Sequence, residues 1–337
     1  MKRKNAGKKR IAVFLGKNVI RALFLAAGVS IVTFFLVSRS PIDPLQANVG
    51  QAALGAMSEA QLQQLRDYWG MDTPAVTRFL HWAGDFLRGD MGVSLLYRRA
   101  VAEIIGEKLI NSLLLMITAW ILSGLLGFAL GVIAGANIGK WQDRLIKGYA
   151  VLTASTPAYW IGLLLLLIFG VWLRLFPVGL GVPIGVAAEE VTILERLHHA
   201  VLPALALSIT GASSIILHTR EKMSEVMESD FMLYARARGE RNVQMVMRHG
   251  IRNILLPAMT LQFASIGEIF GGSVLIEEVF SYPGLGQAAV SAGLGSDIPL
   301  LMAITVISAL LIFAGNLTAN VLYGVIDPRI QRGGQGS

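Results

Sequence analysis

The sequence predicts an all-α membrane protein with about six transmembrane helices. Composition is the first observation: 54% of the 337 residues are hydrophobic and only 15% are charged, whereas about a quarter of a soluble domain is charged. The second observation is a series of six apolar segments, each near the length of about 20 residues that a helix needs to cross the hydrocarbon core. The third is an uneven distribution of Lys and Arg between the connecting segments, which is typical of membrane topology.

The apolar segments differ in how closely they match an ideal span. The first carries Arg21 near its start, where a long side chain can reach the headgroup region. The fifth is the weakest because it contains Glu268 and a Gly-Gly pair at 271–272. The expected spans are residues 19–37, 109–136, 149–175, 200–219, 256–280 and 299–324.

The basic residues orient these spans. An even number of spans puts both termini on one side, and with that side in the cytoplasm the cytoplasmic segments carry 20 of the 29 Lys and Arg residues. Seven of the other nine lie in the long segment 38–108, where charge has less influence on topology. The sequence therefore predicts cytoplasmic termini, with an N-terminal tail over 1–18, a C-terminal tail over 326–337 and a single transmembrane domain over 19–337.

A basic segment, residues 220–255, joins the fourth and fifth spans in the cytoplasm. Its seven bases exclude a further span, because each base at the membrane centre costs about 2.5–3.5 kcal/mol. Its pattern predicts two short helices: Ser229 or Asp230 begins the first, and Gly239 takes the left-handed position that ends it. Asn242 is expected to cap the second helix. Such a protrusion suits docking into the groove of a partner, and the alternative is a loop that only sets topology or touches lipid headgroups.

Several sequence blocks resemble one protein family. YARARG at 234–239, followed by His249 and Asn253, resembles the cytoplasmic coupling loop (the EAA loop) of ABC-importer permeases, in the form found in dipeptide, oligopeptide and nickel permeases. GGSVLIEEVFSYPGLG at 271–286 resembles the fifth helix of that family and the loop after it. The other matching blocks are Asp43-Pro44, GMDTP at 70–74, GDMGVS at 89–94, STPAYWIG at 155–162, HHAVLPALALS at 198–208 and DPRI at 327–330.

This resemblance implies a type I importer permease of the bacterial cytoplasmic membrane, with no active site of its own. It would pair with a second, homologous permease and dock one or two cytoplasmic ABC ATPases, which hold the ATP and Mg²⁺. An extracytoplasmic binding protein would deliver the substrate, and segment 38–108 would form an extracytoplasmic cap. The chain itself is expected to bind no cofactor, metal or nucleic acid. Di- or oligopeptides are the expected substrates, and nickel chelates or opine-type metallophores are the alternative.

The resemblance also assigns roles to individual residues. The family often has Ser two residues after the glycine of the loop, and here that position is Arg241, so Asn242 is expected to start the second helix one residue later. The acidic start of the family's loop is replaced by Leu233. The residues expected to couple the chain to the ATPase are Tyr234, Ala235, Arg236, Ala237, Arg238 and Gly239, supported by His249 and Asn253.

Two regions near the fifth span are candidates for the translocation pathway or its gate. Glu268 is a candidate because an ionisable group within a spanning helix is functional by default, and the alternative is a residue that faces a vestibule or the partner permease. Glu277 and the adjacent Glu278 lie near the outer end of the span. The turn formed by Tyr282, Pro283 and Gly284 fits a tight re-entrant loop.

Two other motifs are weaker candidates for a binding site. GANIGK at 135–140 lacks the spacing of a phosphate loop and has Trp141 where Ser or Thr would hold Mg²⁺, so it is interpreted as a helix end and a turn. His198 and His199 are adjacent and point apart, which favours structural roles over a metal site.

An ion-coupled secondary transporter would show inverted repeats and several buried carboxylates. An intramembrane enzyme would show HExxH or GxSxG, which this sequence lacks.

Overall fold

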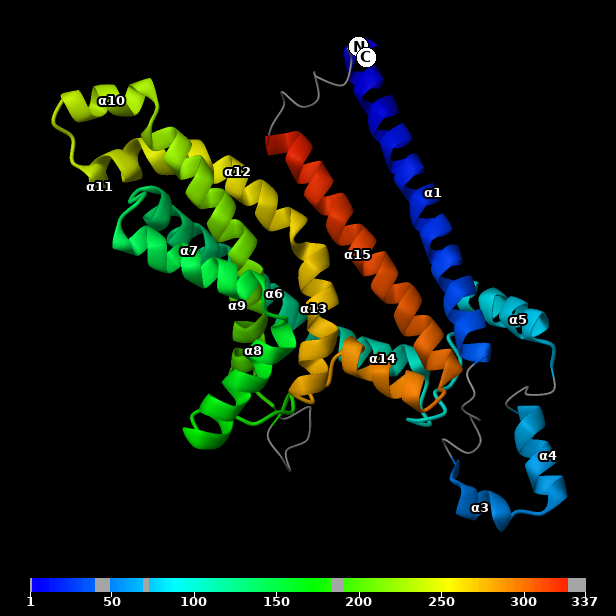
Figure 1. Ribbon diagram of the computed structural model, residues 1–337. Coiled ribbons are helices and arrows are strands. Elements are labelled where there is room, and N and C mark those ends of the chain that lie inside the picture. Colours follow the sequence, from blue (N-terminus) through cyan, green and yellow to red (C-terminus); the bar gives the residue numbers. More distant parts are fainter. Residues whose placement is uncertain (1, 40–48, 69–72, 183–190, 327–337) are drawn as a thin grey trace. The chain divides into compact units, whose positions relative to one another are not determined.

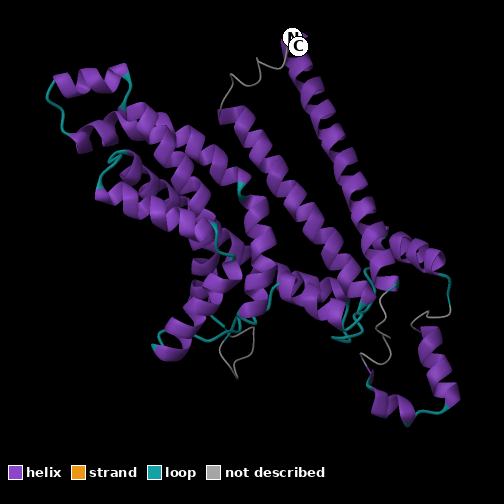
Figure 2. Cartoon of the chain, in the orientation of Figure 1, coloured by secondary structure: helices purple, strands orange, loops and turns teal. Residues whose placement is uncertain are grey.

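The computed structural model describes residues 2–39, 49–68, 73–182 and 191–326. These residues form helices and loops (Figure 2). A single isolated antiparallel bridge joins Val93 and Ala100 within these described residues. The Asp43-Pro44 and DPRI blocks and the C-terminal tail lie outside the described residues. The predicted all-α class is confirmed.

Among the described residues, four helices are long and apolar enough to cross a membrane, and two bent helix pairs raise the number to six if each pair is one span. The four are α1 (Lys2–Ser38), α6 (Val101–Gly135), α9 (Ile193–Met227) and α15 (Ile298–Ile326) (Figure 1). They correspond to the first, second, fourth and sixth predicted spans. The prediction of about six transmembrane segments is therefore confirmed, with two of them broken.

The third predicted span is not one straight helix. It is formed by α7 (Trp141–Ala154), α8 (Ala158–Leu165) and a π-helical turn over Leu166–Trp172, and the axis bends by 106° between α7 and α8. The break falls at residues 155–157, where Pro157 immediately precedes α8. A proline restricts the preceding residue to extended conformations, which ends α7. The span predicted over 149–175 is therefore present as a broken helix pair and not as one straight helix.

A second bend divides the fifth predicted span. The helical run 242–264, which ends with α12 (Ile251–Ala264), is bent by 46° against α13 (Ile266–Val279). At the bend, the Ser265 hydroxyl donates to the Gln262 carbonyl at 2.8 Å, and the Trp120 indole donates to the same oxygen at 2.7 Å. These two donors satisfy a backbone group beside the break, which a helix within a membrane requires.

Tertiary contacts divide the chain into two compact units, which are described one at a time. The first comprises residues up to 110 and 285–314, and the second comprises 111–284 and the residues from 315 onward. The first unit includes four shorter helices. Three of them lie between α1 and α6 in the sequence, α3 (Gln51–Gly55), α4 (Glu59–Tyr68) and α5 (Ala75–Leu87), and the fourth, α14 (Leu285–Leu294), directly precedes α15. The sequence predicted no helix at α14, and at 10 residues this helix is too short to cross a membrane.

The first unit has an apolar core beneath a buried carboxylate. Asp297 is fully buried and accepts hydrogen bonds from the Ser94 hydroxyl and, at 3.0 Å, from the Leu96 backbone N–H. Its other oxygen accepts from the Leu300 N–H at 3.2 Å, so the same side chain also caps the start of α15. The buried apolar residues of this core include Val101, Ile104, Ile105, Leu285, Ala288 and Leu300.

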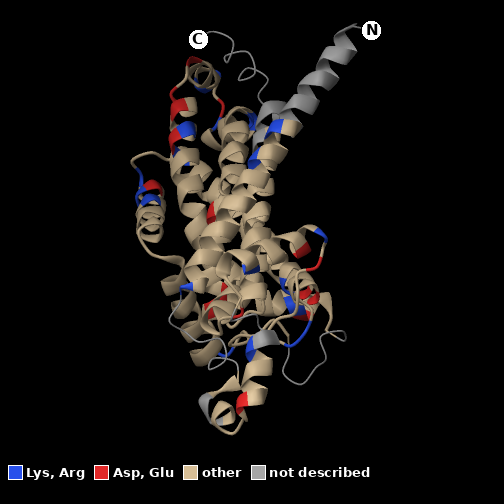
Figure 3. Ribbon diagram, turned by 90° about the vertical axis from the view of Figure 1, so that its right-hand side faces the viewer, with Lys and Arg blue, Asp and Glu red and all other residues tan. Residues whose placement is uncertain are grey.

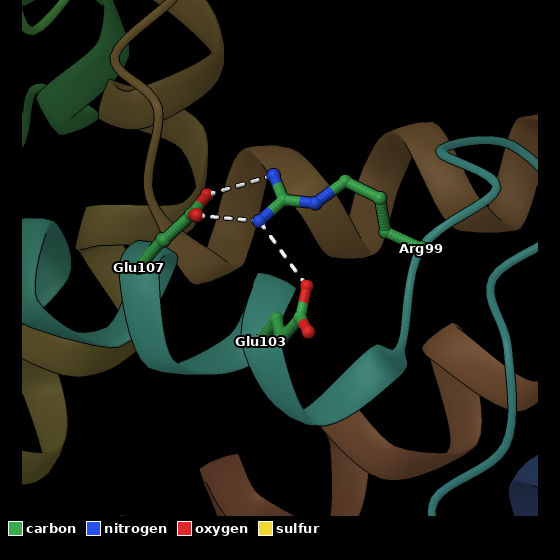
Figure 4. Close-up of polar contacts among 3 residues, drawn as sticks. All are labelled: Arg99, Glu103 and Glu107. Carbon is green, nitrogen blue, oxygen red and sulfur yellow. Dashed lines mark hydrogen bonds and ion pairs between the residues drawn. The ribbon is translucent and has the colours of Figure 1, made fainter.

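An exposed ion-pair cluster holds the start of α6 (Figure 4). The Arg99 guanidinium lies 2.7 Å from Glu107 and 3.4 Å from Glu103, which are both on the first turns of the helix. The hydrogen bond to Glu107 and its charge raise the pKa of Arg99 above its usual range. Because all three side chains are largely exposed, the cluster orients the chain entering α6 and adds little to stability.

Helix α9 is the centre of the second unit and contacts α7, α8, α12 and α13. It approaches α6 closely because α6 presents a glycine at every fourth position. A Cβ added to Gly127, Gly131 or Gly135 would lie 2.7, 2.5 and 2.5 Å from atoms of α9. Such stripes of small residues are typical of helix pairs in membranes. The long helices carry few charges along their middle (Figure 3), and the shorter α13 carries Glu268 in its first turn and Glu277 near its end.

Candidate functional site

Two short helices beyond α9 form the α10–α11 hairpin, residues 228–250 (Figure 1). α10 spans Asp230–Ala237, α11 spans Asn242–Met245, and a π-helical turn over Val246–Gly250 leads into α12. The two predicted helices are thus confirmed, and α10 begins at Asp230 after Ser229 as expected. The Ser229 hydroxyl donates to the Val226 carbonyl of α9 and does not cap α10.

Gly239 ends α10 in the left-handed conformation that the sequence predicted, with φ +82°. The Gly239 N–H donates to the Arg236 carbonyl at 3.0 Å, and the Glu240 N–H donates to the Ala235 carbonyl at 3.2 Å. This pair of bonds is a Schellman motif, which satisfies the last carbonyls of a helix. A residue with a Cβ is strained at this position, so the glycine gives the hairpin a defined turn.

The start of α11 differs from the expectation. Arg241, not Asn242, occupies the N-cap position, and its backbone N–H donates to the Gln244 side-chain oxygen at 3.0 Å. The Asn242 side chain donates instead to the Ala136 carbonyl at the end of α6, at 3.3 Å. Asn242 is therefore the first helical residue, and its amide serves a tertiary contact that local sequence rules do not reveal.

One face of the hairpin is buried. Met232 and Ala235 of α10 lie three residues apart on the same face and pack with Met245 of α11. Val226 and Met227 at the end of α9 complete this apolar cluster. Ala235, one of the residues expected to couple the chain to a partner, is therefore 4% exposed and holds the hairpin together from inside.

The opposite face of the hairpin is exposed, and it is both apolar and basic. Leu233 and Tyr234 are 63% and 66% exposed, and Val243 on α11 is 73% exposed. The Arg238 guanidinium lies 5.9 Å from the centre of the Tyr234 ring, within range of a cation–π contact. Large apolar side chains gathered on one surface mark an interaction site more often than a solvated loop. The remaining expected coupling residues, Arg236 and Ala237, are also exposed, and Arg236 borders the side of the hairpin that faces the α6–α7 turn.

His249 and Asn253, the two expected supporting residues, contact each other and the hairpin. The Asn253 amide donates to the His249 carbonyl at 2.8 Å. The His249 Nε2 lies 3.2 Å from the Glu240 carboxylate, so the residue after the Gly239 turn is joined to the turn that leads into α12. The sequence analysis did not single out Glu240. The available signal was an acidic residue directly after the glycine that ends α10, followed nine residues later by a histidine.

A cavity of about 600 Å³ lies between the hairpin and the turn that connects α6 to α7. The turn is formed by the GANIGK segment, with Gly139 at φ +76°, which confirms its interpretation as a helix end and a turn. The polar residues that line the cavity include Asn137, Lys140, Glu228, Arg236, Glu240 and Asn242.

An ion pair fastens the α6–α7 turn to α9. The Arg220 guanidinium binds both carboxylate oxygens of Asp143, with Nη2 2.9 Å from Oδ2, and Asp143 is 4% exposed. The same carboxylate accepts from the Gly139 backbone N–H at 2.9 Å. Two-point contact of this kind fixes orientation as well as distance. The ion pair thus links the α6–α7 turn to α9, and α9 continues directly into the hairpin.

Glu277, a gate candidate in the sequence, is a fully buried residue at the end of α13. The Ser112 hydroxyl of α6 donates to its carboxylate at 2.6 Å. Gly284 lies directly against the same group, because a Cβ there would be 2.3 Å from the carboxylate. The side chain thus occupies the space beneath the 281–284 turn and joins α13 to α6.

The rest of the 281–284 turn is also held from α6. The Asn111 amide donates to the Pro283 carbonyl at 3.0 Å, and the Arg196 guanidinium of α9 donates to the Asn111 side-chain oxygen at 3.3 Å. Tyr282 is 1% exposed, and burial, with the charge of Glu277, raises its pKa to about 12. Glu277, Tyr282, Pro283 and Gly284 are therefore brought together as the sequence grouped them.

Glu268 is apart from this cluster. It lies in the first turn of α13, directly after the bend at Ser265, and its side chain is exposed. A carboxylate at the N-terminal end of a helix is stabilised by the helix dipole. The position is consistent with either alternative that the sequence left open.

The histidine pair takes part in local packing. The His199 Nδ1 lies 3.0 Å from the Leu180 carbonyl, and the His198 ring centre lies 5.5 Å from that of Phe176. Within the described ranges, no group of three or more His, Cys, Asp or Glu side chains is placed to hold a metal ion.

Comparisons with known proteins agree on one family. A family model described as a binding-protein-dependent transport system inner membrane component matches residues 127–332. The oligopeptide transport system permease protein AppB of Bacillus subtilis is 32% identical over 95% of this chain and 100% of its own length. A putative peptide permease protein of Brucella ovis is 32% identical over 92% of this chain and 96% of its own. The glutathione transport system permease protein GsiC of Escherichia coli is 33% identical over 93% and 96%.

The matched residues include the α10–α11 hairpin, the bend at Ser265 and the 281–284 turn. The alignments with the permeases also cover nearly the whole of both chains. The chain is therefore a multi-pass membrane protein that belongs to the binding-protein-dependent transport system inner membrane components, the ABC-importer permeases that its sequence resembles.

Proposed function

We propose that this chain is one of two permease subunits of an ABC importer for di- or oligopeptides, and that it docks a cytoplasmic ATPase through the α10–α11 hairpin. The names of the relatives, which include oligopeptide and glutathione permeases, support a peptide substrate. Nickel chelates and opine-type metallophores remain the alternative cargo. In this arrangement both termini are cytoplasmic.

The observation that carries the proposal is the two-sided construction of the hairpin. Its inner face is fixed by Met232, Ala235 and Met245, while Leu233 and Tyr234 are exposed on the outer face. A helix of this kind can enter a groove with its apolar side chains, and the neighbouring bases set its orientation. Because the Schellman turn and the Glu240–His249 contact brace it, the helix can transmit motion without unfolding.

The proposal assigns the chemistry of ATP to other subunits. One or two ABC ATPases bind the ATP and Mg²⁺, a second permease completes the pathway, and an extracytoplasmic binding protein brings the substrate. ATP can drive a change of access only if it binds the two conformations of the complex with different affinity. The hairpin transmits the resulting conformational change to this chain, because it is joined to α9 at its beginning and to α12 at its end.

Purification of the tagged chain in mild detergent, with mass spectrometry and an ATPase assay, tests the assembly. We expect a second permease and one or two ATPases to co-purify, and we expect hydrolysis to rise when binding protein and peptide are added together. Stimulation across a panel of peptides and metal chelates then names the substrate class.

Two hairpin variants test the coupling role. Arg238→Glu reverses a charge on the exposed face, and Gly239→Val strains the turn, so each should reduce peptide uptake about tenfold or more while the protein still inserts. Lys222→Glu is the matched control, since Lys222 is an exposed base on α9 outside the hairpin, and it should transport normally. Normal uptake by both hairpin variants would rule out this docking surface.

A further inference from the structure

Helix α7 has a buried side and an outer side with different chemistry. On the buried side, Asp143, Ala150 and Thr153 face α9, and the Thr153 and Ser213 hydroxyls are 2.7 Å apart. The outer side of the same helix forms a shallow cavity of about 560 Å³. Its lining residues are Arg144, Lys147, Gly148, Val151, Leu152 and Ser155.

Charged and apolar side chains follow each other along this cavity. Arg144 and Lys147 lie within two turns of the α6–α7 turn, and Val151 and Leu152 follow one turn farther along the helix. Val151 and Leu152 are 48% and 67% exposed. At 1.5 Å per residue, Arg144 and Leu152 are separated by about 12 Å along the axis. The cavity therefore changes from cationic to apolar over the length of a lipid headgroup and the first part of its chains.

The two bases are available to a ligand. Neither forms a salt bridge with any other residue that the structure describes. The nearest acidic residue on the helix, Asp143, lies one turn before Lys147, but it is buried against α9 and is occupied by Arg220 and the Gly139 N–H. None of the residues that line the cavity is acidic. An anion that enters it therefore meets two positive charges, and the Asp143 carboxylate nearby is already neutralised by Arg220.

We propose that this cavity binds an anionic phospholipid of the leaflet that faces the α6–α7 turn. The phosphate is held between Arg144 and Lys147, and an acyl chain lies against Val151 and Leu152. Charge complementarity and the order of the side chains favour a lipid over a protein segment, because the apolar residues follow the bases along a helix of the third candidate span. Trp141, 68% exposed at the same end of the helix, is typical of side chains at the membrane interface.

Lipid competition on the purified, assembled complex tests the proposal. The complex is placed in nanodiscs of equal parts phosphatidylglycerol and phosphatidylcholine, and the retained lipids are counted by native mass spectrometry. We expect the wild-type protein to retain phosphatidylglycerol preferentially. The double variant Arg144→Gln and Lys147→Gln should bind it about thirtyfold more weakly, since each base near the surface contributes a factor of about five.

Two matched variants make the result specific. Arg144→Lys with Lys147→Arg keeps both charges and should retain the lipid. Lys222→Gln removes an exposed base from α9, away from the cavity, and should also leave binding unchanged. If the neutral double variant is unstable, the single variants Arg144→Gln and Lys147→Gln should each show about a fivefold loss.

Three outcomes would overturn the proposal. Equal retention of phosphatidylglycerol by the wild-type and neutral variants would remove the role of the bases. If the wild-type complex retained phosphatidylcholine as well as phosphatidylglycerol, the surface would bind lipid through its apolar residues alone. Cross-linking of Lys147 to another subunit of the complex would show that a protein covers this face of α7.

Discussion

Glu240 and His249 close the α10–α11 hairpin: the Glu240 carboxylate lies 3.2 Å from His249 Nε2, across nine residues of chain. The two side chains are 17% and 34% exposed, so the contact is partly shielded from water. It links the turn after α10 to the helix that continues into the membrane, and it is therefore placed to keep α10 in a fixed orientation.

Removal of either partner should loosen the hairpin modestly. We expect Glu240→Ala and His249→Ala each to lower the free energy of unfolding, with a coupling between them of no more than about 1 kcal/mol because the pair is partly exposed. Glu240→Gln should be milder, since an amide can still hydrogen-bond the imidazole. A double-mutant cycle from thermal unfolding of the purified protein measures the coupling, and strictly additive effects would show that the contact contributes nothing.

Gly239 should tolerate asparagine better than a β-branched residue. At φ +82° a non-glycine residue costs about 1–2 kcal/mol, and Asn adopts this conformation more readily than Val. A Cβ at this site would meet nothing within 4 Å, so the effect comes from the backbone and not from a clash. Thermal stability should fall in the order wild type, Gly239→Asn, Gly239→Val. Gly106→Ala on α6, where a Cβ is also free of contacts, should not destabilise the protein.

The Asp143–Arg220 pair should respond strongly to loss of its cation. Arg220→Ala leaves the buried Asp143 carboxylate without its main partner, and we expect a loss of about 3 kcal/mol in stability. Adding Asp143→Ala to that variant should restore part of the loss, because the uncompensated charge is removed. The control Lys222→Ala breaks an exposed pair and should have no measurable effect. Full additivity of the two alanine substitutions would contradict this account.

Gly284 should be intolerant of even one methyl group. The methyl of Gly284→Ala would lie 2.3 Å from the Glu277 carboxylate, which cannot swing aside because it is fully buried and bound by Ser112. We expect a loss of about 1–3 kcal/mol from overpacking. Glu277→Asp retracts the carboxylate and should partly rescue Gly284→Ala. Gly271→Ala on the same side of the bend, where a Cβ meets nothing, is the control. Absence of rescue would show that the two residues act separately.

A pathway role for Glu268, one of the two alternatives for this residue, predicts an effect on the choice of substrate. Loss of one exposed carboxylate weakens attraction for a cationic peptide by about 1 kcal/mol, so Glu268→Gln should reduce uptake of such peptides about fivefold relative to neutral ones. Glu221→Gln removes an exposed carboxylate from α9, outside the candidate pathway residues, and serves as the control. Uptake assays with matched lysine- and alanine-containing peptides measure the ratio. An unchanged ratio would favour the structural alternative for Glu268.

The sequence alone determined the class of the protein, the approximate positions of its spans and the form of the α10–α11 hairpin. These features depend on local properties: the length of an apolar run sets whether a helix can cross a membrane, and Gly239 is readily placed because few residues adopt its backbone conformation. Family resemblance added the roles of the hairpin residues, since side-chain chemistry alone left a topology signal as an alternative.

Only the tertiary structure decided where the spans bend and which polar groups are buried. The 106° bend falls at Pro157, whose effect on the preceding residue is local, but its size, like the 46° bend at Ser265, depends on how the helices pack. Asp143 and Arg220 are 77 residues apart, and Ser112 and Glu277 are 165 apart. No local pattern predicts these pairs, because each depends on which face of a helix its neighbours cover. For the same reason the sequence placed Asn242 as a cap, whereas its amide donates to the Ala136 carbonyl directly after α6.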